Sequence, residues 1–231
     1  MSDVLRVALV AEGPTDRIVI QAAIEAMIPN RSFILRQIHP EESAAFGEMG
    51  TGWVGVYRWC RKAVDRRNKN DGIDPIFANF DLLLLHLDAD VAGKSYTDNN
   101  VVGEANDLPC ELPCPPPRAT TDALRVVLAR WFGADPLPFQ VVVCMPSKST
   151  ESWVVAAVFP NDAAVASIEC NLSVVARLGV QPIAKRIRKT PRDYHAVRPQ
   201  ITAAWPRLVA SLSEAQRFHV EFGTAIAFIP Q

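Results

Sequence analysis

The sequence predicts an α/β fold in which a mostly parallel β-sheet is flanked by helices and followed by a mainly helical C-terminal region. Three observations point to this class. Short apolar runs recur along the chain, segments of helical periodicity separate them, and hydrophobic residues make up 49% of the 231 residues. Apolar runs of this kind are typical of strands that are buried on both faces of a parallel sheet. Strands that alternate with helices favour such a sheet.

The length of the chain is suited to one large α/β domain or to a core with a small appendage. We expect residues 1–160 to form the core, with a loop insertion around 91–117 that is rich in Asn, Asp, Gly and Pro. Residues 161–231 are expected to form a helical extension that packs on this core.

The first half of the core is expected to contain three strands and two helices. Thr15 or Asp16 can cap the first helix, and Pro29 ends it. We expect strands at 5–11, 32–38 and 80–87, helices from about 15 to 27 and at 56–67, and a loop at 40–55.

The second half is expected to contain one further strand and several helices. The strand at 139–145 is apolar throughout its centre, and the helix before it can be capped by Thr120 or Thr121. We expect helices at 120–132, 151–159, 168–178 and 199–212.

Acidic residues follow two of the predicted strands. Glu12, Gly13 and Asp16 come after the first strand, and Asp88 and Asp90 come after the strand at 80–87. The carboxyl ends of parallel strands form the ligand-binding edge of an open sheet, so these side chains are expected to converge. Carboxylates crowded together repel one another without a cation, and hard oxygen ligands suit Mg²⁺ or Mn²⁺. Acidic residues that merely favour a helix N-terminus or a solvated loop are the structural alternative.

The two motifs, Glu12-Gly13-x-x-Asp16 and Asp88-x-Asp90, resemble those of the Toprim domain. This domain occurs in topoisomerases, bacterial primases, OLD-family nucleases and small Toprim-like proteins. The resemblance implies a Mg²⁺-dependent phosphodiesterase, in the form of a nuclease acting on DNA or RNA in bacterial defence or repair. It implies that Glu12 is a metal ligand or an acid/base group, that Asp88 and Asp90 are metal ligands, and that Asp16 orients the site or binds through water.

Two residues after the strand at 139–145 extend the expected site. The resemblance to OLD-type nucleases implies that Lys148 stabilises the transition state and that Glu151 is a ligand of a second metal ion. A helix start capped by Ser149 or Thr150 is the structural alternative for this segment. Lys94 is expected to neutralise a substrate phosphate. It lies in a segment similar to a P-loop, but Asp88 replaces the glycine that such a loop needs to wrap a phosphate.

The densest basic segment is expected to bind the phosphates of a nucleic acid, and Tyr194 beside it is available to stack on a base. A solvated charged surface is the alternative, because the net charge of the whole chain is −1 and gives no global basic signature. The residues expected to bind nucleic acid here are Lys185, Arg186, Arg188, Lys189 and Arg192.

The remaining composition points to an ordinary soluble protein. There is no signal peptide and no long apolar run, so we expect a cytoplasmic protein without a membrane span. The five cysteines are expected to be reduced thiols, and Cys110 and Cys114 lack the second pair that a zinc site needs. His86, inside the third strand, is expected to be a hydrogen-bonded core residue rather than a ligand.

Two other functions stay open at this stage. The chain could be a non-catalytic Toprim-like module that binds nucleic acid or a protein partner within a larger complex. It could also be a phosphatase or nucleotide-processing enzyme of another α/β fold. The aspartate pair of haloacid-dehalogenase-like enzymes, however, normally follows the first strand, where this chain has Glu12 and Gly13.

Overall fold

A four-stranded sheet forms the centre of the computed structural model, which describes residues 4–41, 49–102, 106–171 and 173–229. The strands all run parallel and lie in the order β2-β1-β3-β4. This confirms the predicted α/β, Rossmann-like arrangement. The strands are β1 (Leu5–Val10), β2 (Phe33–His39), β3 (Leu82–His86) and β4 (Val141–Cys144).

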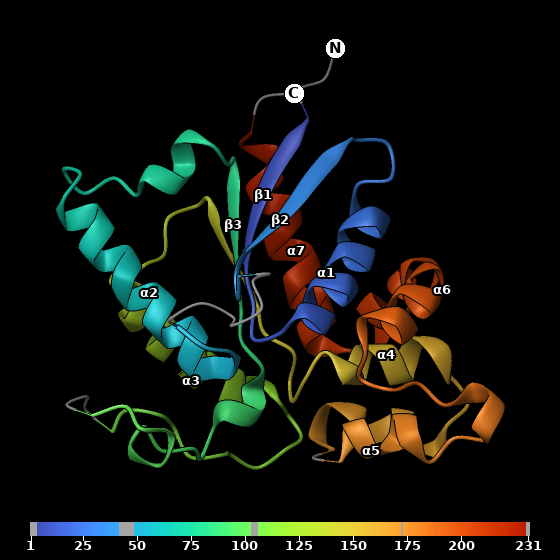
Figure 1. The fold of residues 1–231 in the computed structure, drawn as a ribbon. Coiled ribbons are helices and arrows are strands. Elements are labelled where there is room, and N and C mark those ends of the chain that lie inside the picture. Colours follow the sequence, from blue (N-terminus) through green and yellow to red (C-terminus); the bar gives the residue numbers. More distant parts are fainter. Residues whose placement is uncertain (1–3, 42–48, 103–105, 172, 230–231) are drawn as a thin grey trace.

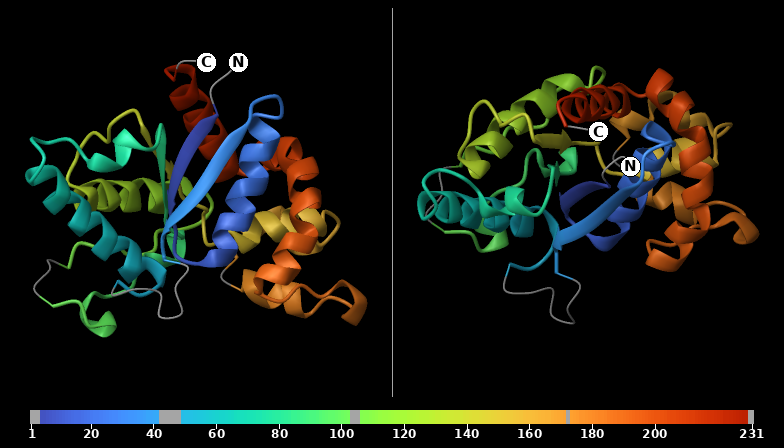
Figure 2. Two further views of the ribbon diagram at one scale, coloured as in Figure 1. Left: turned by 45° about the horizontal axis from the view of Figure 1, so that its top comes forward. Right: turned by 90° about the horizontal axis from the view of Figure 1, so that it is seen from above.

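Helices cover both faces of this sheet (Figures 1 and 2). One face is covered by α2 (Gly52–Asn68) and α3 (Arg118–Phe132), which contribute to one apolar cluster. The helices on the other face contribute to a second cluster. They are α1 (Pro14–Met27), α4 (Glu151–Val158), α6 (Pro191–Ser211) and α7 (Ser213–Ala227).

Strands β3 and β4 and most of β1 are apolar on both sides because each face of the sheet is covered there, whereas the edge strand β2 is only partly buried. In β1, Val7 and Leu9 face the cluster of α1 and α6, whereas Ala8 and Val10 face the cluster of α2 and α3. Successive side chains of a strand point to opposite faces, so a strand covered on both sides must be apolar at every position. The apolar runs of the sequence therefore located these strands correctly.

Helix α2 begins earlier than expected. Its first residue is Gly52, within the segment predicted as a loop, and Trp53 and Val56 lie on its buried face. Gly50 and Gly52 have φ values of 76° and 69°, so they provide the left-handed turns that lead into the helix. Glycines at a helix entry are easily taken for a loop in the sequence. Residues 42–48 of the predicted loop lie outside the described residues.

The C-terminal helices also differ in their bounds from the expectation. Helix α6 begins at Pro191 rather than at 199, because Pro191 occupies the first helical position and the Thr190 hydroxyl accepts a hydrogen bond from the Asp193 N–H. The expected helix at 168–178 is divided into a 3₁₀ stretch, Ala163–Cys170, and a short helix, α5 (Val174–Gly179).

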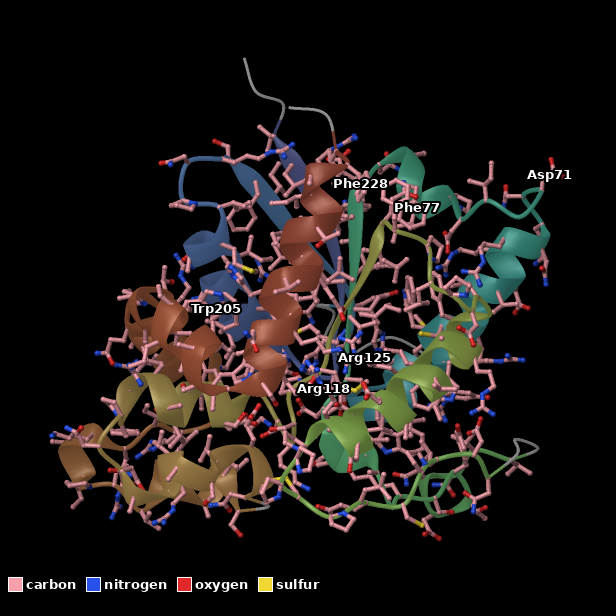
Figure 3. The ribbon with its side chains drawn as sticks, turned by 180° about the vertical axis from the view of Figure 1, so that it is seen from behind. Asp71, Phe77, Arg118, Arg125, Trp205 and Phe228 are labelled. Atoms are coloured by element: carbon pink, nitrogen blue, oxygen red, sulfur yellow. A yellow bond between two sulfur atoms is a disulfide. The ribbon has the colours of Figure 1, made fainter. Side chains whose placement is uncertain are left out.

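The C-terminal helices pack on the core through aromatic side chains. The rings of Trp205 on α6 and Trp153 on α4 meet edge to face with centroids 5.3 Å apart, and Trp153 stacks on Phe218 of α7. Figure 3 shows Trp205 beside α6 and α7. All three rings are fully buried, so the helices after residue 160 share the core of the sheet.

A disulfide joins the insertion to the C-terminal extension. Cys114 and Cys170 are bonded, with their Cα atoms 5.5 Å apart, so the expectation that every cysteine is a reduced thiol is wrong. The two residues are 56 positions apart, and nothing in their local sequence indicates the pairing. Cys60, Cys110 and Cys144 are free thiols.

The insertion lies near the same end of the molecule as the carboxyl ends of the strands and α5, at the bottom of Figure 1. Its described part contains a short 3₁₀ turn, Thr97–Asn99, and no longer helix or strand; residues 103–105 lie outside the described residues. No helix in the described part of the chain is long and apolar enough to cross a bilayer.

Candidate metal centre

Acidic side chains from two neighbouring strands meet at the carboxyl edge of the sheet. Glu12 follows β1, Asp88 follows β3, and these two strands pair side by side. Glu12 Oε1 accepts a hydrogen bond of 2.7 Å from the Asp88 N–H. The parallel topology therefore brings these two residues together, as the position of the motifs predicts.

Asp16 joins this pair from the first turn of α1. Its Oδ2 atom accepts a hydrogen bond of 2.8 Å from the Gly13 N–H, so the carboxylate caps the helix. Its Oδ1 atom accepts a hydrogen bond of 2.7 Å from the Thr150 hydroxyl. The N–H of Thr150 also donates to Asp88 Oδ1, at 3.2 Å. Asp16 thus caps α1 and also lies beside Asp88 through their shared partner, Thr150.

His86 completes a group of side chains that could bind a metal ion. Its Nε2 atom lies 3.1 Å from Asp88 Oδ1, and its Nδ1 atom lies 3.8 Å from Asp16 Oδ2. One ligand atom from each of Asp16, His86 and Asp88 lies within 4.8 Å of the others, and all three residues are buried. We refer to these three residues and Glu12 as the acidic cluster.

The expectation that His86 is a hydrogen-bonded core residue is only half right. The ring is fully buried, but neither nitrogen makes a well-aligned hydrogen bond within the described residues. His86 ends β3, and Asp88 follows two residues later in extended backbone. Residues two apart in extended chain share a face, which is why the imidazole and the carboxylate lie together.

Burial and mutual repulsion disfavour the charged carboxylates of this cluster. Burial, and then the charge of Asp88, raise the pKa of Glu12 well above its usual range. Burial also raises the pKa of Asp88, to about 7. Burial alone would lower the pKa of His86, but the charges of Asp16 and Asp88 together raise it to about 9. The cluster is therefore short of positive charge, which a bound cation would supply.

Asp90 lies outside this cluster. The chain enters a 3₁₀ turn at Ala89–Val91, and the Asp90 side chain is 46% exposed. Its Oδ1 atom accepts a hydrogen bond of 2.9 Å from Lys94 Nζ. The expectation that Asp88 and Asp90 share a face is wrong because it assumed that the strand continues, and the alternation of side chains ends with the strand. Lys94 is likewise paired with Asp90.

Glu151 contacts a cation of the protein itself. Its Oε1 atom lies 2.9 Å from Lys189 Nζ and accepts a hydrogen bond of 2.7 Å from the Tyr194 hydroxyl. Burial alone would raise the pKa of Glu151, but the charge and hydrogen bond of Lys189 lower it. Tyr194 is fully buried, so the expectation that it stacks on a base is wrong.

Lys148 is paired with the insertion. Its side chain is only 6% exposed, and its ammonium forms an ion pair with Glu111. Thr150 stands at the N-cap position of α4, but its side chain does not cap the helix. The Thr150 hydroxyl instead donates a hydrogen bond to Asp16.

The basic segment does not form one surface. Lys185 and Arg186 line an open hollow of about 360 Å³ beside Val158 and Phe159, and only Lys189 contacts a residue beside the acidic cluster. Arg188 and Arg192 are exposed. The segment divides in this way because it bends through a 3₁₀ turn, Ile183–Lys185, before α6 begins.

Two residues were not assigned to the site from the sequence. His86 was expected to be structural, and Thr150 was considered only as a cap, yet both contact Asp16 and Asp88. The signal for both was their position at or just after the end of a buried strand. Comparison of the chain with protein-family models, curated proteins and solved structures gives no match.

Proposed function

We propose that the protein is a Toprim-type, metal-dependent phosphodiesterase, and that it is a nuclease acting on DNA or RNA. The observation that carries the proposal is the buried group of Asp16, His86 and Asp88 beside Glu12, at the ligand-binding edge of a parallel sheet. The Glu12-Gly13-x-x-Asp16 motif lies in the strand-to-helix turn that the Toprim resemblance requires.

Each residue near the edge has a role in this proposal. Asp16, His86 and Asp88 hold a divalent ion, which when bound activates water and stabilises charge on a phosphate. Glu12 lies beside these ligands and moves a proton or completes the coordination. Lys148 contacts the substrate phosphate after Glu111 releases it.

The donor set favours Mn²⁺ over Mg²⁺. Mg²⁺ prefers oxygen ligands throughout, whereas an imidazole nitrogen suits first-row transition metals. His86 would be the nitrogen donor, and the two aspartates would be the oxygen donors. Binding to His86 requires its neutral form, so the ion would displace a proton from the imidazole.

A matched pair of variants tests the proposal. Purified protein is incubated with plasmid, single-stranded DNA and RNA, in the presence of Mn²⁺, Mg²⁺ or a chelator. We expect metal-dependent cleavage by the wild type, none by Asp88→Asn, and retained cleavage by Asp90→Asn, because only Asp88 belongs to the acidic cluster.

Thermal melting supplies a second readout, since an ion bound only by the folded state raises the melting temperature. The Mn²⁺-dependent rise should be present in Asp90→Asn and absent in Asp88→Asn. A wild type that neither cleaves any nucleic acid nor gains stability from either metal would refute the proposal.

A non-catalytic binding module is the second candidate, and two contacts favour it. Lys94 is paired with Asp90, and Lys148 is paired with Glu111, so both lysines expected to contact phosphate are occupied by carboxylates. This candidate predicts that Mn²⁺ stabilises the protein and that no nucleic acid is cut.

A further inference from the structure

The start of α6 holds a lysine beside the acidic cluster. Lys189 precedes Thr190, the N-cap of α6, and its Nζ atom lies 2.9 Å from Glu151 Oε1. Two hydrogen bonds fix the local backbone: the Arg188 N–H donates to the Asp193 carboxylate at 2.9 Å, and the Asp193 N–H donates to the Thr190 hydroxyl at 3.3 Å. The lysine is therefore presented from an anchored turn.

Glu151 and Lys189 form an ion pair beside the cluster in which the carboxylate is buried and the lysine side chain is half-exposed. The Glu151 side chain is 0% exposed, and the Tyr194 hydroxyl donates to the same carboxylate oxygen that Lys189 contacts. Burial alone would lower the pKa of Lys189, but Glu151, and then Asp16 and Asp88, raise it. The ammonium thus stays charged and interacts with carboxylates of the cluster as well as with Glu151.

We infer that the site takes one divalent cation and that the Lys189 ammonium stands in place of a second one. The inference rests on the proposed metal-dependent function. Sites with two metal ions hold them about 3.5–4 Å apart, which requires enough carboxylates to offset four positive charges. With Glu151 paired to Lys189, the carboxylates left at the site among the described residues are Glu12, Asp16 and Asp88. Three negative charges suffice for one divalent ion, and a second ion would also meet the repulsion of the ammonium.

The role of Glu151 changes accordingly. The resemblance to OLD-type nucleases implied that this residue binds a second metal ion, whereas its contacts make it the counterion of Lys189. The C-terminal extension then completes the charge balance of the site, because Lys189 and Tyr194 both belong to it.

The test counts Mn²⁺ ions bound to the full chain. Calorimetric titration gives the stoichiometry, and the electron paramagnetic resonance signal of free Mn²⁺ gives an independent count. We expect one ion per chain in the wild type and two in Lys189→Met, in which Glu151 is released. Lys69→Met is the matched control, because this exposed lysine at the far end of α2 has the same charge; it should bind one ion.

If Lys189→Met does not fold, Glu151→Gln tests whether Glu151 is a metal ligand. The amide can still accept the hydrogen bond of Tyr194, and we expect one ion per chain with an affinity unchanged within about threefold, since Glu151 is not a ligand. Loss of Mn²⁺ binding in Glu151→Gln, or an unchanged count in folded Lys189→Met, would overturn the inference. Two ions in the wild type would overturn the inference alone, whereas no binding at all would overturn the proposed metal-dependent function with it.

Discussion

Gly55 is a position where one added methyl group should destabilise the fold. It lies in α2, and an ideal Cβ atom there would be 2.5 Å from His39 Nε2 and 2.9 Å from the Gly50 carbonyl oxygen. His39 ends β2 and is fully buried. The absence of a side chain at Gly55 therefore lets α2 lie close to the end of β2, at the same edge of the sheet as the acidic cluster.

The predicted magnitude combines two opposing effects. Alanine in place of glycine inside a helix gains about 1 kcal/mol from propensity. Forcing an extra methyl group into a packed site typically costs about 1–3 kcal/mol, and the cost should lie at the upper end because one of the two neighbours is backbone. We therefore expect Gly55→Ala to lower the free energy of unfolding by about 1–2 kcal/mol.

Gly223 in α7 is the matched control. Apart from the adjoining residues and the backbone of the helix itself, no described atom lies within 4 Å of the Cβ position there. Gly223→Ala should therefore show the helix gain alone and stabilise the protein by up to about 1 kcal/mol. Urea unfolding of both variants, followed by circular dichroism, measures the difference. In a His39→Ala background, Gly55→Ala should cost less, because the ring is gone and only the Gly50 carbonyl contact is left.

Thermal melting gives the same comparison, with about 2–4 °C expected per kcal/mol for a chain of this size. A Gly55→Ala protein that is as stable as the wild type, or that shifts in the same direction as Gly223→Ala, would refute the reasoning.

Three further predictions concern stability and ligand binding. Burial lowers the pKa of His39 from about 6.5 to about 4, so the unfolded chain binds the proton first as the pH falls. The free energy of unfolding should therefore drop by about 2 kcal/mol between pH 7.5 and 5. In urea unfolding, His39→Gln should flatten this part of the pH profile. Glu111→Gln should release Lys148 and tighten the binding of single-stranded DNA about tenfold, as measured by fluorescence anisotropy. An unchanged affinity would show that the ion pair does not compete with phosphate. The double variant Cys114→Ser, Cys170→Ser should lose up to about 4 kcal/mol of stability, as expected for a loop closed by residues 56 positions apart. Reductant should reproduce the loss in the wild type, and a melting temperature that is insensitive to reductant would contradict this prediction.

Much of the fold and part of the site could be predicted from the sequence because both depend on local patterns. The apolar runs identify strands buried on both faces, and parallel strands present their carboxyl ends at one edge. The sequence therefore predicted that Glu12 and Asp88 lie at one edge of the sheet, and the pairing of β1 with β3 brings them into contact there. Asp16 is placed by the same rule, since it lies in the first turn of the helix that leaves β1.

Only the tertiary structure decided which of the candidate residues share the site. The side-chain alternation that would pair Asp88 with Asp90 stops where the strand ends, and it pairs His86 with Asp88 instead. Glu151 meets Lys189, which lies 38 positions later in the chain, through the packing of α6 beside α4. Cys114 meets Cys170 in the same way. A local pattern records what each segment does alone, whereas these contacts depend on how distant segments pack.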